Sequence, residues 1–153
     1  MGRKGNIDMP QFPSIEWFEA VRALVNQDGR LRRLGTCDAV MGVKVLDQAF
    51  EITFDAFDCA GVREISLADL AKTDFYLGAP FDTWREMLGN IKEHGKPDRQ
   101  YTLNTIDFLD PEGFAKADDQ TTKDKFYRYG QTFQQFFNAS AEFETKFVAP
   151  QPV

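Results

Sequence analysis

The residue types that most often carry catalysis or bind metals are scarce in this sequence. There is one histidine, His94, and there are two cysteines, Cys37 and Cys59. His94 stands in the polar stretch Lys-Glu-His-Gly-Lys, where an imidazole most often is a solvated side chain placed favourably against a helix dipole. The cysteines form no CxxC pair, and no glycine-rich phosphate loop or HExxH motif occurs. We therefore expect no metal ion and no cofactor, and neither a hydrolase nor a nucleotide-using enzyme.

Carboxylates are plentiful, because Asp and Glu together number 24. Asp38, Glu51 and Asp55 alternate with apolar residues, which is typical of the solvated face of a sheet. Asp82 and Arg85 stand three residues apart near an expected helix start, so an ordinary surface pair explains them. An enzyme that uses a carboxylate as base beside an apolar pocket would need a buried one, whose pKa is tuned by that burial.

Composition and charge exclude several classes of partner. The chain has 153 residues, 42% hydrophobic and 27% charged, which is the ordinary range of a globular domain. The net charge of −6 repels phosphate backbones, so we expect no nucleic-acid partner. No apolar run reaches the roughly 20 residues that cross a bilayer, so we expect no integral membrane association. The first ten residues hold no apolar core of the signal-peptide kind, and the few thiols suit a reducing compartment, so we expect a cytoplasmic location.

Phenylalanine is unusually frequent, with 15 residues. Rigid rings fill volume in large fixed blocks, so a core built from them either packs as an aromatic core or encloses a gap. Composition alone leaves both alternatives open.

The first half of the chain predicts a helix followed by a meander of strands. Apolar residues recur at helical spacing in 14–28, with Ser14 as the capping residue. The period then changes to two, which predicts an antiparallel hairpin of strands 34–45 and 50–56. Two shorter strands are expected at 61–66 and 73–77.

The alternation in the second hairpin strand also predicts its orientation. Phe50, Ile52 and Phe54 should face the helices, while Glu51 and Asp55 should face solvent. A shift by one residue would bury the polar set instead.

The second half of the chain is mostly helical. Pro80 opens a helix that ends at Gly95-Lys96-Pro97, and 101–109 forms a short helix. The polar stretch 112–125 is expected to be a loop, and 132–143 a helix. Periodicity leaves 125–129 open between strand and helix.

The order of these elements resembles the sterol carrier protein domain. The likeness is carried by Asp74-Phe-Tyr-Leu-Gly-Ala-Pro-Phe-Asp-Thr-Trp-Arg-Glu-Met-Leu88, a strand that leads into a helix, and by Lys125-Phe-Tyr-Arg-Tyr-Gly-Gln131, which is similar to the last strand of that family. It extends over roughly residues 14–143. It implies an α+β fold with one mixed, mostly antiparallel sheet of about five strands, covered by helices on one face, and an apolar tunnel for lipid-like ligands between the layers.

The resemblance also implies a function and a set of lining residues. The function is binding or carriage of a hydrophobic small molecule such as a lipid, a steroid or a polyketide-like compound. Small residues of the first strand would oppose large residues of the next strand and the helices; the expected lining consists of Phe18, Cys37, Ala39, Phe54, Trp84, Leu88, Phe133 and Phe137. We expect a leader at 1–13, one domain at 14–147 and a flexible tail at 148–153. The oligomeric state stays open, and a homodimer is one alternative.

Two other hypotheses remain beside the carrier. One is a small α+β enzyme of the cyclase, dehydratase or isomerase kind, which requires an inward-facing Asp or Glu. The other is an accessory protein without a ligand, which requires a filled core and an exposed aromatic patch. The scarcity of catalytic groups favours a protein that is not an enzyme.

Overall fold

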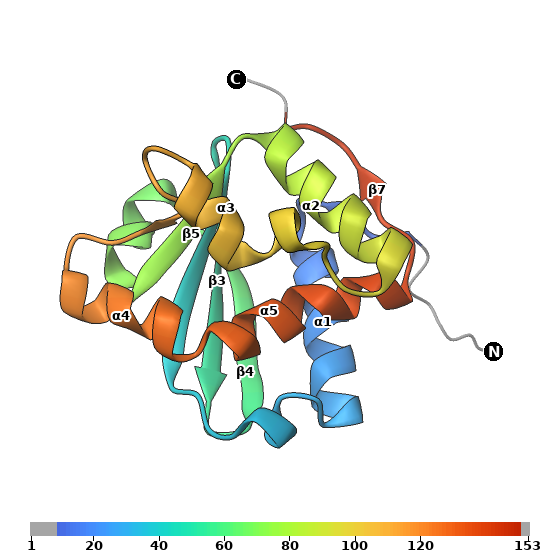
Figure 1. Cartoon of the computed structure of the whole chain (residues 1–153), viewed down its shortest axis with the longest axis horizontal. Helices are drawn as coiled ribbons and strands as arrows, with labels where there is room; N and C mark the ends of the chain where they lie inside the picture. The colour runs from blue at the N-terminus through green and yellow to red at the C-terminus, as the bar shows by residue number, and fades with distance from the viewer. Residues whose placement is uncertain (1–8, 151–153) are drawn as a thin grey trace.

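The computed structural model describes residues 9–150, and these form an α+β fold (Figure 1). The strands are β1 (Gln11–Phe12), β2 (Ala39–Val45), β3 (Gln48–Asp55), β4 (Asp58–Ile65), β5 (Phe75–Ala79), β6 (Ala115–Lys116) and β7 (Lys146–Phe147). The α-helices are α1 (Ile15–Asp28), α2 (Phe81–His94), α3 (Leu103–Leu109), α4 (Gln120–Arg128) and α5 (Gly130–Asn138). Short 3₁₀ helices are η1 (Arg32–Leu34), η2 (Leu67–Lys72), η3 (Arg99–Tyr101) and η4 (Ala139–Glu142).

The main sheet has five strands in the order β4-β3-β2-β5-β6. Strands β2, β3 and β4 form an antiparallel meander, β5 joins β2 in parallel, and β6 pairs with β5 in antiparallel orientation. The sheet is therefore mixed and mostly antiparallel, which confirms the expected fold class.

The first helix and the hairpin that follows it form where the sequence predicts them. The side chain of Ser14 caps α1 by accepting a hydrogen bond from the backbone NH of Trp17 at 3.1 Å. Gly29 ends the helix with φ +71°, a conformation that glycine adopts without strain. Strands β2 and β3 pair from Ala39 with Phe54 to Val45 with Gln48.

The predicted orientation of β3 is confirmed. Phe50, Ile52 and Phe54 are buried on the face that α1 and α5 cover (Figure 1). On the other face Glu51 pairs with Arg63 of β4, with 2.7 Å between Oε1 and Nε. The alternating pattern therefore separates an aromatic interior from a charged outer face.

Residues 112–128 differ from the predictions, whereas the helices expected at 101–109 and 132–143 form as α3 and as α5 with η4. Residues 112–125 are not a simple loop, since they contain β6 and the first turns of α4. Residues 125–128 are helical and not the last strand of the sheet. They belong to α4, which Asp119 caps by accepting from Thr121 NH at 2.8 Å. The last strand is instead the two-residue β6, whose start is held by a carboxylate: Asp107 Oδ1 accepts from Phe114 NH at 2.8 Å and from Ala115 NH at 2.9 Å.

The described part of the predicted leader and tail joins the fold. Strand β1 pairs in parallel with β7, and the NH of Val148 donates to the carbonyl of Phe12 at 3.1 Å. Phe12 is fully buried, and its ring centroid lies 4.9 Å from that of Trp17. Residues 1–8 and 151–153 lie outside the described residues.

Candidate functional site

The eight residues expected to line a ligand site are all buried in one continuous cluster. They come from different elements, since Phe18 lies on α1, Phe54 on β3, Trp84 and Leu88 on α2, and Phe133 and Phe137 on α5; Cys37 and Ala39 lie just before and at the start of β2. The structure therefore brings the predicted set together between the sheet and the helices.

Aromatic rings pack against one another at several points between the sheet and the helices. The ring centroid of Phe133 lies 5.3 Å from that of Phe54 and 5.1 Å from that of Phe75, both with edge-on geometry. The rings of Trp84 and Phe137 are 5.7 Å apart. Such pairs each add about 0.5–1.5 kcal/mol beyond the burial of their area. The sheet and α5 are therefore joined by ring-to-ring packing at these positions.

The interior contains few polar side chains. Within residues 9–150 the buried polar side chains are Thr132, Asn138 and Ser140, and none is a carboxylate. Burial raises the pKa of both Cys37 and Cys59 to about 12, so the two thiols stay neutral near pH 7 and are poor nucleophiles. The buried carboxylate that the enzyme alternative requires is thus not found in this part of the chain.

The single histidine lies at the exposed end of α2. Its Nε2 is 3.7 Å from Glu93 Oε1 and 3.5 Å from Asp98 Oδ2, in a solvated setting, as the sequence predicts. No group of three or more His, Cys, Asp or Glu side chains in the described range could hold a metal ion. Nor does that range contain a helix long and apolar enough to cross a bilayer.

Several carboxylates singled out in the sequence hold the backbone or form surface pairs. Asp38 Oδ1 accepts from the NH of Ala56 at 3.0 Å in the turn between β3 and β4. Asp82 and Arg85 form the expected pair at 3.1 Å. Asp74 accepts from Val40 NH at 2.8 Å and so ties the start of β5 to β2.

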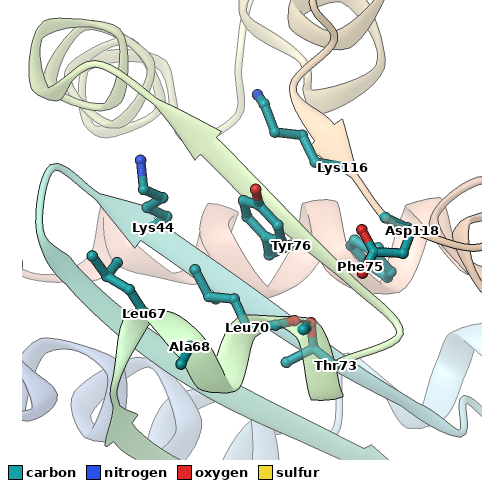
Figure 2. Close-up of a pocket in the computed structure, with 11 residues that line it drawn as sticks. Lys44, Leu67, Ala68, Leu70, Thr73, Phe75, Tyr76, Lys116 and Asp118 are labelled. Atoms are coloured by element: carbon teal, nitrogen blue, oxygen red, sulfur yellow. Dashed lines mark hydrogen bonds between the residues drawn. The ribbon is translucent and has the colours of Figure 1, made fainter.

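Sequence reasoning missed a groove on the outer face of the sheet, shown in Figure 2. Two hollows meet there, with cavity volumes of about 300 and 400 Å³. Both are lined by Lys44 of β2, Tyr76 of β5 and Lys116 of β6. These volumes lie at the lower end of the roughly 300–1,000 Å³ of small-molecule sites.

One sequence signal could have pointed to this groove. Gly42 and Gly78 stand inside strands, where glycine often marks the close approach of another group. A Cβ at Gly42 would lie 2.7 Å from both Leu70 Cδ2 and Tyr76 Cβ, and one at Gly78 would lie 3.3 Å from the Tyr76 ring. Lys116, which lines the groove together with Lys44 and Tyr76, lies in the stretch that the sequence predicts to be a loop.

A third hollow lies at the junction of α4 and α5. Its cavity volume is about 340 Å³, and its lining includes Leu34, Tyr129 and Thr132. Tyr129 connects this hollow to the interior, because its ring centroid is 6.5 Å from that of Phe133.

The comparisons with known proteins support the fold. No protein-family model matches the chain, and no curated protein matches it. A solved structure does: the solution structure of a conserved hypothetical protein from Thermus thermophilus, described as a possible sterol carrier protein. The match has a TM-score of 0.60 and 18% sequence identity, and covers 95% of this chain and 97% of that one. At this identity the likeness shows that the two proteins share a fold.

Proposed function

We propose that this chain binds a hydrophobic small molecule between its sheet and its helices and carries it in the cytoplasm. The observation that carries the proposal is the continuous aromatic layer where the sheet meets α2 and α5. The ligand would be lined by the eight residues predicted from the sequence, from Phe18 to Phe137. The shared fold with a possible sterol carrier protein supports the same class of ligand.

The arrangement of α5 suggests where such a ligand enters. The hollow at the junction of α4 and α5 reaches Thr132 and Tyr129, and Phe133 is the next residue inward. A ligand that enters here would displace the ring of Phe133 from Phe54 and Phe75 and replace ring-to-ring contacts by contacts with its own apolar surface.

The first experiment asks whether a ligand is present at all. Gently purified protein is extracted with organic solvent, and the extract is analysed by mass spectrometry. A panel of fluorescent acyl, steroid and polycyclic probes is then titrated into the protein, and we expect micromolar affinity for at least one probe, near −8 kcal/mol.

The Phe133→Leu variant tests whether the ligand binds in the interior. It replaces an interior ring by a smaller aliphatic side chain that is still apolar, so we expect the variant to fold and to bind the probe more weakly. Phe108→Leu is the matched control, because Phe108 is 82% exposed on α3. If the wild type binds no probe and its extract holds no hydrophobic compound, the carrier proposal is wrong.

One observation favours a second candidate, an accessory protein without a ligand. The interior is closed by rings at the points described above, and Phe108 and Leu109 form an exposed apolar pair on α3, 82% and 65% exposed. Such a protein would bind none of the probes. Its association would weaken in a Phe108→Ser, Leu109→Ser double variant, measured by sedimentation velocity.

A further inference from the structure

We propose that the outer groove is a second binding site, specific for a small monocarboxylate that carries an apolar tail. The inference is independent of the interior site, because it stands on the opposite face of the sheet. It starts from the pairing of the strands: Tyr76 is the partner of Lys116 on one side and of Gly42 on the other, while Lys44 is the partner of Gly78.

Two ammonium groups point toward one end of the groove. Strands β2 and β6 flank β5, and Lys44 pairs with Gly78 whereas Lys116 pairs with Tyr76. The backbones of Lys44 and Lys116 are therefore two strand spacings and two residues along the strand apart, about 12 Å. Lys116 extends back along β6, and its Nζ donates to the carbonyl of Gly78 at 3.0 Å and to that of Gly113 at 2.7 Å. Figure 2 shows both lysine nitrogens and the hydroxyl of Tyr76 pointing toward the same end of the groove. A carboxylate placed there would meet donors from three strands.

Neither ammonium is neutralised by a carboxylate within the described residues. The ion pairs of this part of the chain involve neither Lys44 nor Lys116. Asp110, Glu112 and Asp118 also line the two hollows, without pairing with the lysines. These three acidic residues outnumber the two lysines, so they repel a doubly charged phosphate ester more strongly than a monocarboxylate.

One wall of the groove is apolar. It is formed by Leu67, Ala68 and Leu70 of η2 (Figure 2), together with Ala71, and Leu67 is 43% exposed. The hollow of about 300 Å³ on this side has room for about ten water-sized groups, enough for a medium-length hydrocarbon chain. Two lysines and one aliphatic wall match an amphipathic carboxylate.

Octanoate is the probe for this proposal, titrated into the full chain and followed by isothermal calorimetry and by the NMR signals of Tyr76. We expect octanoate to bind, and octanol and inorganic phosphate each to bind at least about fivefold more weakly. Lys44→Gln and Lys116→Gln should each weaken octanoate about fivefold, in the range of a partly exposed charge pair. Leu67→Ala should weaken octanoate while leaving acetate unchanged.

The controls separate this site from the interior. Lys72→Gln is the matched lysine control, because Lys72 lies on η2, pairs with Asp69 at 3.2 Å and does not line the groove. Among the described residues the side chain of Lys44 makes no hydrogen bond, and its carbonyl accepts from Trp84 Nε1 at 3.2 Å, which Lys44→Gln leaves in place. Lys44→Gln should therefore remain folded even if Lys116→Gln does not. If octanoate does not bind, or if its affinity responds to Phe133→Leu and not to Lys44→Gln, the groove proposal is overturned. Failure of the interior probes leaves it standing.

Discussion

Truncation of Phe133 tests the aromatic layer directly. The ring is fully buried and lies against Phe54 of β3, Phe75 of β5 and Tyr129 at the start of α5. It therefore joins two elements of the sheet to the helix that covers them. Phe133→Ala removes these contacts and leaves a cavity that the rigid surrounding rings fill poorly.

The magnitude follows from that geometry. Burial of a phenyl side chain contributes about 1.5–3 kcal/mol, and the cavity raises the cost of Phe133→Ala to about 3–5 kcal/mol. In a chain of 153 residues this lowers the melting temperature by roughly 10 °C. Phe133→Leu retains most of the apolar volume and should cost about 1.5 kcal/mol.

Urea unfolding followed by tryptophan fluorescence measures the effect, because Trp17 and Trp84 are both buried. Phe108→Ala is the same substitution at an exposed position and should change the free energy of unfolding by less than about 0.5 kcal/mol. If Phe133→Ala costs no more than Phe108→Ala, the ring does not join α5 to the sheet, and the argument for the interior site fails with it.

Three further predictions concern the sheet and its attachment to α1. Gly42→Ala should destabilise the protein by about 1–3 kcal/mol in urea unfolding, because its Cβ would lie 2.7 Å from Leu70 Cδ2; an unchanged midpoint would contradict the close packing of η2. Asn26→Ala should cost about 2 kcal/mol in the same assay, because the Asn26 side chain accepts from Cys59 NH at 2.8 Å and donates to its carbonyl at 2.9 Å; a loss below about 0.5 kcal/mol would show that these bonds are not needed. Burial raises the pKa of Cys37 and Cys59 to about 12, so both thiols remain protonated up to a higher pH in the folded chain than in the unfolded chain. Alkylation by iodoacetamide at pH 8.5 should therefore be slow until urea is added. Alkylation of the native protein at the same rate as the unfolded protein would refute this.

Most of the fold could be predicted because its strong signals are local. The capping residue Ser14 and the glycine after Asp28 define α1, and alternation in 50–55 defines both the strand β3 and its buried face. Such patterns depend on neighbours in the sequence, and the tertiary structure agrees with them.

The predictions were wrong where tertiary contacts, and not the local sequence pattern, determine the secondary structure. Strand β6 has only two residues and therefore no period; it forms because Asp107 binds the amides before and within it. The stretch 125–128 has strand-like composition, but Phe126 packs inward against Phe75 as part of an amphipathic helix, with ring centroids 5.5 Å apart. The resemblance to a last strand was wrong at this point, and the sheet is completed by an earlier segment.

The interior residues were also easier to predict than the groove. An apolar residue on the inner face of a helix or strand belongs to the core almost regardless of the details of packing. The groove depends on three charged or polar side chains from β2, β5 and β6 that are distant in the sequence, and β6 itself was not predicted. Only the glycines inside β2 and β5 mark it beforehand.

The two proposed sites share one wall. On β5, Phe75 and Leu77 point into the aromatic layer, while Tyr76 and Gly78 face the groove, because side chains alternate along a strand. The backbone of β5 is held on one side by five paired residues of β2 and on the other by β6, so neither ligand requires the strand to move. Phe75 also lines the groove, whereas Phe133 does not line it and Lys44 does not belong to the aromatic layer. This is why Phe133→Leu and Lys44→Gln can assign any bound compound to the interior or to the groove.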